Sequence, residues 1–306
     1  MAARSAATTT SSPPSQPGAL VIPGAVRSLA YAGRALIMGI LNVTPDSFSE
    51  PGAFRSPGAA VDHARRMADE GADVIDIGGE STRPGAEPVP IEDELGRVIP
   101  VVRQLAKALS IPLSVDTFKA EVAEQALDAG ASFINDVTAL RGDALMAGVA
   151  ARSKAGVILM HMQGTPRTMQ VQPQYDDVVE DVAAALADRI RVAEAAGIAR
   201  ERLMIDPGLG FGKTLEHNLA LLRRLDRFVA MGLPVVIGPS RKSFIGALTG
   251  APVDQRLAGT LACVAWAQQC GAHLVRVHDV KPAADVLAML GAIEPHGSGG
   301  DAGGRE

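Results

Sequence analysis

The chain has 306 residues, of which 47% are hydrophobic and 21% are charged. This composition is typical of a folded globular protein and excludes an intrinsically disordered one. A net charge of −5 without a basic block, together with only 3% aromatic residues, argues against a nucleic-acid-binding protein. No run of 18 apolar residues occurs, and no hydrophobic segment follows Met1. We therefore expect a cytoplasmic protein that is neither secreted nor membrane-spanning.

Three segments differ in composition. Residues 1–19 consist mainly of Ala, Ser, Thr and Pro, and residues 295–306 are rich in Gly. Both are predicted to be flexible tails, because they hold too few apolar side chains to form a core. A transit peptide is the alternative for the first tail, but it contains a single arginine. The folded domain is predicted to span residues 20–294.

Short apolar runs alternate with amphipathic stretches along this domain. The runs predict eight strands, over residues 35–41, 73–77, 112–115, 131–135, 156–160, 203–205, 234–237 and 273–277. The stretches between and after them predict helices over residues 59–70, 92–109, 120–129, 144–155, 176–196, 215–228, 256–271 and 283–290. Eight buried parallel strands, each followed by a helix, predict an α/β protein with a single (β/α)₈ TIM barrel. A doubly wound open sheet is the alternative.

Polar residues recur where the predicted strands end. In a barrel these ends converge on one mouth, where catalytic groups lie. Each such residue could instead cap a helix or form a turn, and this alternative is strongest for Asp136 and Ser240. The residues are Asn42, Gly79, Glu80, Asp116, Asn135, Asp136, His161, Asp206, Ser240 and His278.

The last two strands favour an anion site. Arg276 and His278 share one face of the eighth strand, and together they would form an anion clamp. The alternative is that Arg276 pairs with a neighbouring carboxylate. The loop after the seventh strand contains Arg241 and Lys242 before a predicted helix start, which suits an anion or an electron-rich oxygen. A solvated basic loop is the other interpretation of that segment.

The segment Asp206-Pro-Gly-Leu-Gly-Phe-Gly-Lys contains neither of two common phosphate-binding motifs. A P-loop needs glycine at Pro207, and a dinucleotide fingerprint needs glycine at Lys213. Its glycines are instead expected to let the backbone approach a flat ligand closely. Asp206, Asp116 and Asn135 would then hydrogen-bond a heterocycle that carries an amino group beside ring nitrogens. A single buried aspartate is more often a structural acceptor, but three such groups in one mouth favour a ligand.

The connections after the first two strands are rich in Gly and Pro, and are predicted to cover the site. Asn42 offers one amide oxygen for Mg²⁺, an ion that commonly binds through few protein ligands together with substrate phosphates. We therefore expect Mg²⁺ to need the substrate in order to bind tightly.

Seven motifs in chain order resemble the dihydropteroate synthase family. They lie between residues 41 and 280 and cover nearly all of the predicted domain. Two neighbours of the motifs, Phe118 and Pro239, depart from the family pattern without replacing a motif residue. The motifs are Leu41-Asn-Val-Thr-Pro-Asp-Ser-Phe-Ser, Gly78-Gly-Glu-Ser-Thr-Arg-Pro-Gly, Ser114-Val-Asp-Thr, Met160-His-Met-Gln-Gly, Asp206-Pro-Gly-Leu-Gly-Phe-Gly-Lys, Ser240-Arg-Lys-Ser and Arg276-Val-His-Asp-Val.

The resemblance implies a pterin-binding barrel of folate synthesis. It would condense 6-hydroxymethyl-7,8-dihydropterin diphosphate with 4-aminobenzoate and release diphosphate with the help of Mg²⁺. A homodimer is implied by the family alone. The implied site consists of Asp116, Asn135, Asp206 and Lys242 for the pterin, Arg83, Arg276 and His278 for the diphosphate with Thr82 nearby, Asn42 for Mg²⁺, and Phe48, Pro84 and Ser243 for 4-aminobenzoate.

The mechanism implied by the family is dissociative. Diphosphate leaves first, and the aniline nitrogen then attacks a carbocation at the methylene carbon. Asp46 would stabilise that cation, and Asp116, Lys242 and Arg276 would be catalytic. Two alternatives remain: a pterin-binding methyltransferase barrel, and a paralogue that binds pterin without catalysis.

Overall fold

Eight parallel strands form a barrel. The computed structural model describes residues 20–44, 57–83 and 85–293. Neighbouring strands follow the order β8-β7-β6-β5-β4-β3-β10-β9, and a parallel bridge between Ile205 and Val235 brings the two edges together. This nearly closed arrangement confirms the predicted (β/α)₈ barrel, and the open-sheet alternative is wrong. The strands are β3 (Leu36–Asn42), β4 (Val74–Gly78), β5 (Leu113–Asp116), β6 (Phe133–Asp136), β7 (Gly156–Met160), β8 (Leu203–Asp206), β9 (Val236–Ile237) and β10 (Leu274–Val277).

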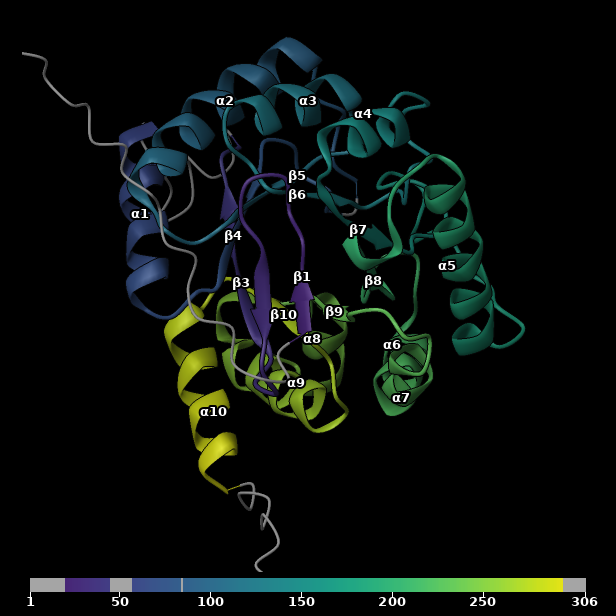
Figure 1. The fold of residues 1–306 in the computed structure, drawn as a ribbon. Coiled ribbons are helices and arrows are strands. Elements are labelled where there is room, and N and C mark those ends of the chain that lie inside the picture. The colour runs from purple at the N-terminus through teal and green to yellow at the C-terminus, as the bar shows by residue number, and fades with distance from the viewer. Residues whose placement is uncertain (1–19, 45–56, 84, 294–306) are drawn as a thin grey trace, which may run out of the picture.

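Helices surround the strands (Figure 1). The single helix predicted over residues 215–228 is in fact two, because the backbone leaves the helical conformation at Arg224, where φ is −113° and ψ is 35°. None of the helices that the structure describes is long and apolar enough to cross a membrane. They are α1 (Pro57–Asp69), α2 (Ile91–Ala108), α3 (Ala120–Asp128), α4 (Met146–Ser153), α5 (Val178–Ala195), α6 (Leu215–Arg223), α7 (Leu225–Val229), α8 (Ser243–Thr249), α9 (Leu257–Gln269) and α10 (Val280–Ile293).

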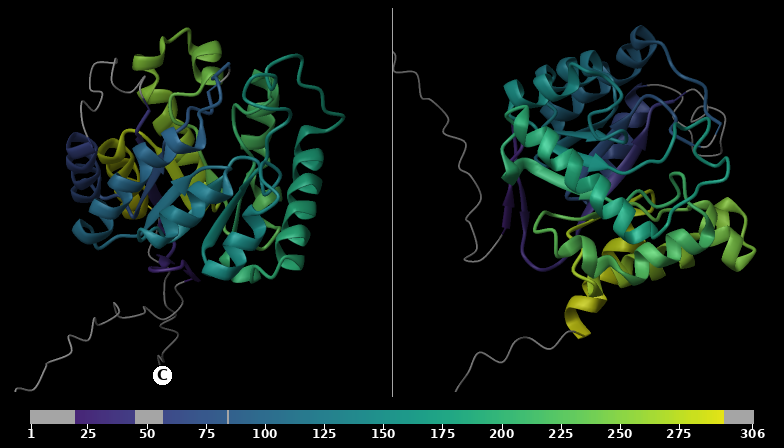
Figure 2. Two further views of the ribbon diagram at one scale, coloured as in Figure 1. Left: turned by 90° about the horizontal axis from the view of Figure 1, so that it is seen from above. Right: turned by 90° about the vertical axis from the view of Figure 1, so that its right-hand side faces the viewer.

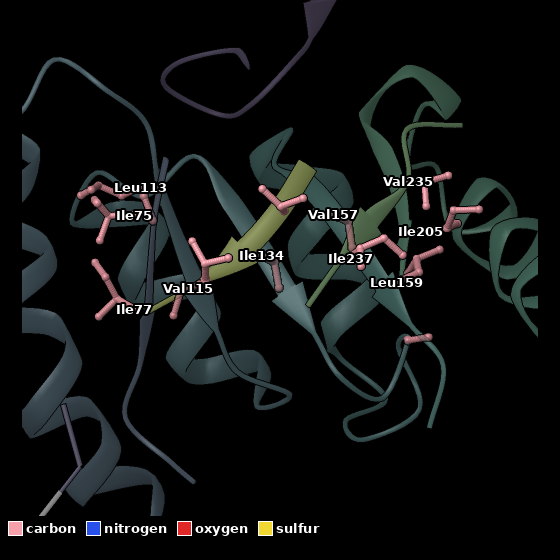
Figure 3. Packing of buried hydrophobic residues seen from close by; sticks show 14 of the residues in the cluster. Ile75, Ile77, Leu113, Val115, Ile134, Val157, Leu159, Ile205, Val235 and Ile237 are labelled. Carbon is pink, nitrogen blue, oxygen red and sulfur yellow. The ribbon is translucent and has the colours of Figure 1, made fainter. Parts of the chain in front are cut away.

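Buried apolar side chains form two layers, because successive residues of a strand point to opposite faces. The outer layer lies between the strands and the helices, and Figure 3 shows part of it around Ile75, Val115 and Ile205. The inner layer fills the barrel and contains Leu36, Met38, Val74, Phe133, Ile158, Met204, Val236 and Leu274.

An antiparallel hairpin lies at one end of the barrel (Figure 2, purple). It consists of β1 (Leu20–Ile22) and β2 (Leu29–Tyr31), and the sequence did not predict it. Ile22 and Leu29 are buried against the inner layer, so the hairpin covers that layer at this end of the barrel. Its strands have three residues each, which is too short for a period of two to be recognised.

The opposite end of the barrel is polar. On four strands, a polar residue follows an inner apolar residue by two positions and therefore points to the same side. The pairs are Val74 and Asp76, Phe133 and Asn135, Met204 and Asp206, and Leu274 and Arg276. On each of these strands, the apolar interior of the barrel and its polar mouth are thus only two residues apart.

Candidate active site

A pocket at this mouth is lined by six of the thirteen predicted site residues. Asp116, Asn135 and Asp206 are at most 7% exposed and come from three different strands. The pocket therefore combines buried acceptors and donors with an apolar wall. It is lined by Thr82, Asp116, Asn135, Val137, Met160, Asp206, Gly208, Leu209, Phe211, Gly238, Lys242 and Arg276.

Arg276 is held between two carboxylates. Its Nε donates to Asp76 Oδ2 at 2.6 Å, and its Nη2 donates to Asp116 Oδ2 at 2.6 Å. Asn135 Nδ2 also donates to Asp76 Oδ2, at 2.9 Å. Within the described part of the chain, Asp76 Oδ1 and Asp116 Oδ1 are buried without a hydrogen-bond partner. Of these two residues Asp116 lines the pocket, so its Oδ1 is the acceptor that remains for a donor from a ligand.

The pKa values of the pocket residues follow from burial among charges. Burial, opposed by the charge of Arg276 and assisted by that of Asp76, raises the pKa of Asp116 to about 7. Burial, followed by the charge of Arg276, lowers the pKa of Lys242 to about 8. Burial also raises the pKa of Asp206, against the effect of the Gly208 N–H. Both forms of Asp116 are therefore accessible near neutral pH.

The β8–α6 loop builds one wall of the pocket. Asp206 Oδ1 accepts a hydrogen bond from Gly208 N at 2.7 Å, which leaves Oδ2 for other donors. Gly208 has a φ of +70°, and a Cβ there would lie 2.0 Å from the carbonyl oxygen of His161. The Phe211 ring lies beneath Lys242, with Nζ 3.9 Å from its centroid. Gly208 thus contacts a neighbouring loop and also lines the pocket, and its approach to a ligand stays a prediction.

A buried lysine supports this wall from behind. Lys213 is 3% exposed, and its Nζ lies 2.9 Å from the Phe211 carbonyl oxygen and 3.0 Å from His161 Nδ1. Burial lowers its pKa to about 7, although Asp206 opposes the shift. This residue therefore ties the β7 and β8 loops together.

The β9 and β10 ends meet through side chains. Ser240 Oγ lies 2.9 Å from His278 Nδ1, and Arg241 forms an ion pair with Asp279 at 2.7 Å. Burial and then the charge of Arg276 lower the pKa of His278 to about 3, so its imidazole is neutral at pH 7. Arg241 is thus committed to Asp279, and Lys242 is the cation of this loop that faces the pocket.

Comparison with known proteins identifies the family. Residues 38–278 match the family described as pterin binding enzyme. The dihydropteroate synthase of Escherichia coli K12 is 49% identical over 256 residues, which cover 84% of this chain and 90% of that protein. The chain belongs to the dihydropteroate synthase family.

Two solved structures of the family, both from Xanthomonas albilineans, have similar folds. The dihydropteroate synthase with 4-aminobenzoic acid is 49% identical, with a TM-score of 0.85 over 90% of this chain and 99% of that one. The complex with 7,8-dihydropteroate is 47% identical, with a TM-score of 0.78 over 87% and 96%. The predicted family, its transferase class and its role in folate synthesis are confirmed.

The structure also places the other residues implied by the family. Thr82 lines the pocket, whereas Asn42 lies at the end of β3 and Ser243 is the exposed first residue of α8. Arg83 is exposed and directly follows Thr82, so it lies at the rim of the pocket. Its charge also contributes to the lowered pKa of His278, after burial, Arg276 and Arg241. Asp46, Phe48 and Pro84 lie outside the described residues.

Sequence reasoning missed Asp76, the carboxylate that binds both Arg276 and Asn135. A signal was present, because a charged residue in the middle of a buried strand requires a partner. The strand repeat that aligned Arg276 with Leu274 also aligns Asp76 with Val74. Phe211 was missed as well, and its role under Lys242 depends on a loop path that no periodicity predicts.

Proposed function

We propose that this pocket carries out the dihydropteroate synthase reaction with 6-hydroxymethyl-7,8-dihydropterin diphosphate and 4-aminobenzoate. The observation that carries the proposal is the set of buried polar groups from four strands in one narrow pocket. Asp116, Asn135 and Asp206 would bind the amino group and ring nitrogens of the pterin, with Lys242 beside them. Because each of these groups needs a partner when buried, the set selects a ring that has donors and acceptors along its edge.

The diphosphate would lie at the β10 side of the pocket. Arg276, Arg83 and His278 would bind it, with Thr82 nearby. Arg276 is tied to Asp76 and Asp116, so it would give up or share these contacts when an anion arrives. His278 is neutral, so it would contribute one hydrogen bond and no charge.

We propose that the reaction is dissociative. The bond between the methylene carbon and the diphosphate oxygen breaks first, and the bonding electrons leave with the diphosphate. The amine of 4-aminobenzoate then attacks the cationic methylene carbon and releases a proton. Arg276 and Lys242 would stabilise the leaving group, and Asp46 would stabilise the cation. Phe48, Pro84 and Ser243 would contact 4-aminobenzoate.

We also propose that Mg²⁺ takes part, held by Asn42 and by the diphosphate. Among the residues that the structure describes, no group of three or more His, Cys, Asp or Glu side chains is arranged to hold a metal. A single amide oxygen fits an ion that takes its remaining ligands from phosphate oxygens and water. The ion would neutralise charge on the diphosphate as it leaves. Calorimetry should detect weak Mg²⁺ binding alone and much tighter binding once diphosphate is added.

A direct assay tests the proposed reaction. Purified protein with the pterin diphosphate, Mg²⁺ and 4-aminobenzoate should release diphosphate and form 7,8-dihydropteroate in equal amounts. Pterin binding without product would favour the non-catalytic paralogue, and pterin-dependent methyl transfer would favour the methyltransferase alternative. Asp116→Asn serves as the matched variant, since it retains the shape of the side chain and should lose activity.

We further propose a cytoplasmic homodimer that binds neither nucleic acid nor membrane. Helix α9 is apolar on nearly every side, yet Trp266 is 49% exposed on it. Leu248 in α8 and Val253 in the segment before α9 are 62% and 55% exposed. Large apolar side chains exposed on neighbouring helices, as on α8 and α9, support an interface there. Sedimentation analysis should give twice the chain mass for the wild type and the chain mass for Leu248→Glu.

A further inference from the structure

A buried cluster of three charged side chains lies next to the mouth, outside the pocket. Lys119 Nζ lies 2.7 Å from Glu80 Oε2, 2.6 Å from Glu94 Oε2 and 2.6 Å from the carbonyl oxygen of Val89. The side chain of Glu94 is fully buried, and those of Glu80 and Lys119 are 8% and 13% exposed. We refer to Lys119, Glu80 and Glu94 as the Lys119 cluster.

The cluster closes the base of the connection between β4 and α2. Glu80 lies near the start of this segment and Val89 near its end, and Lys119 contacts both. Glu80 Oε1 also accepts a hydrogen bond from Val89 N at 3.2 Å. A Cβ at Gly79 would lie 2.9 Å from Cγ of Glu94, so the strand end packs directly on the cluster. The two ends of the segment that carries Thr82 and Arg83 are therefore joined.

Lys119 also connects this segment to the pterin side of the pocket. It precedes α3 and follows Asp116 by three residues, and its backbone N–H donates to Thr117 Oγ1 at 3.2 Å. Helices α2 and α3 are neighbours on the outside of the barrel (Figure 1). The Lys119 side chain thus links the chain that follows Asp116 to the segment that carries Thr82 and Arg83.

The charges of the cluster argue for a role beyond stability. Burial lowers the pKa of Lys119, but its hydrogen bonds to Glu80 and Glu94 raise it more, so the lysine remains charged. Glu94 Oε1 has no partner among the described residues. Well-packed apolar side chains usually stabilise a fold as well as a buried ion pair does, whereas an ion pair fixes one specific geometry.

We infer that Lys119 is a positioning residue, which holds Thr82 and Arg83 at the diphosphate end of the pocket while Asp116 binds the pterin. This inference rests on the proposed function, because it divides the substrate into a pterin part and a diphosphate part. The lysine does not touch the substrate. It acts through Glu80 and the segment that follows.

A comparison of two ligands tests the inference. Calorimetry on Lys119→Met should show at least about a tenfold loss of affinity for the pterin diphosphate. Affinity for 6-hydroxymethylpterin, which lacks the diphosphate, should change less than about twofold. Lys119→Arg should restore much of the loss, because guanidinium can donate to both carboxylates. Lys107→Met, on the exposed end of α2, is the matched control and should behave as wild type.

Equal losses for both ligands, or no loss for either in folded Lys119→Met, would overturn the inference. If Lys119→Met does not fold, Glu80→Gln replaces it, since glutamine keeps an oxygen for Val89 N and removes only one charge. Glu80→Gln should then lose more affinity for the pterin diphosphate than for 6-hydroxymethylpterin. An unchanged ratio of these two affinities would count against the inference.

Hydrogen exchange without any ligand separates this inference from the proposed function. The Val89 amide should exchange at least about tenfold faster in Lys119→Met or Glu80→Gln than in the wild type, and Lys107→Met should not change it. Unchanged exchange would show that the cluster does not hold the segment. A wild-type protein that binds neither pterin ligand would refute the proposed function. The exchange result would still test whether the Lys119 cluster holds the segment between β4 and α2.

Discussion

At the scale of single residues, the site depends on which buried groups already have partners. Asp76 uses one oxygen for both Arg276 and Asn135, and Asp116 uses one oxygen for Arg276. Each carboxylate keeps a second oxygen that is buried and unpaired in the described structure. Because an unpaired buried acceptor is costly, the free oxygen of Asp116, which lines the pocket, favours a ligand that donates hydrogen bonds. The same arrangement explains why Arg276 is positioned before any anion binds.

Asp206→Asn tests the binding of the ring. Asparagine keeps an oxygen for Gly208 N, so the loop should retain its conformation. The second oxygen becomes an amino group that faces the ring N–H groups, and an unmade buried hydrogen bond costs about 1–3 kcal/mol. Pterin affinity should fall at least about tenfold in calorimetry. An unchanged affinity in the folded variant would remove Asp206 from the site.

Lys242→Met tests the charge of the buried lysine. In the folded protein burial lowers the pKa of Lys242 from 10.5 to about 8. Between these pH values the unfolded chain binds more protons than the folded one, so the free energy of unfolding rises with pH. Lys242→Met should reduce this rise between pH 8 and 10 in urea titrations. Identical slopes for the two proteins would show that Lys242 has an ordinary pKa.

At the scale of elements, two loops meet where no side chain fits. Gly208 of the β8–α6 loop faces the backbone of His161 after β7. Gly210 lies against Lys242, and a Cβ at Gly210 would be 3.0 Å from the Cδ atom of that lysine. Lys213 binds both loops from behind. The wall of the pocket is therefore a contact between two backbones, and its shape depends on glycine.

Gly208→Ala tests this contact. Alanine at a positive φ costs roughly 1–2 kcal/mol, and the Cβ would also collide with the His161 carbonyl oxygen. We expect a loss of at least that much in the free energy of unfolding, together with weaker pterin binding. Gly96→Ala is the control, because its Cβ would meet no atom within 4 Å inside α2. It should stabilise the protein by up to about 1 kcal/mol. Equal stability of the two variants would contradict this expectation.

At the scale of the whole molecule, the sequence divides the chain into tails of residues 1–19 and 295–306 and a domain of residues 20–294. Both tails lie outside the described residues, so this division stays a prediction. Deleting residues 1–18 and 297–306 should leave turnover and the melting temperature nearly unchanged, because their composition provides little apolar surface. A fall of more than about 4 °C in calorimetry would mean a contribution on the order of 1 kcal/mol or more.

The sequence by itself determined the barrel and the polar side chains that line the pocket. Strands buried on both faces are continuously apolar, and polar residues such as Asp116, Asn135 and Asp206 interrupt them at their ends. This local pattern needs no knowledge of distant contacts. Only the tertiary structure decided the partners: Arg276 between Asp76 and Asp116, and Lys119 among Glu80, Val89 and Glu94. Strand pairing and loop paths bring these groups together from as many as 200 residues apart, and hydrophobic periodicity describes only neighbours in the chain.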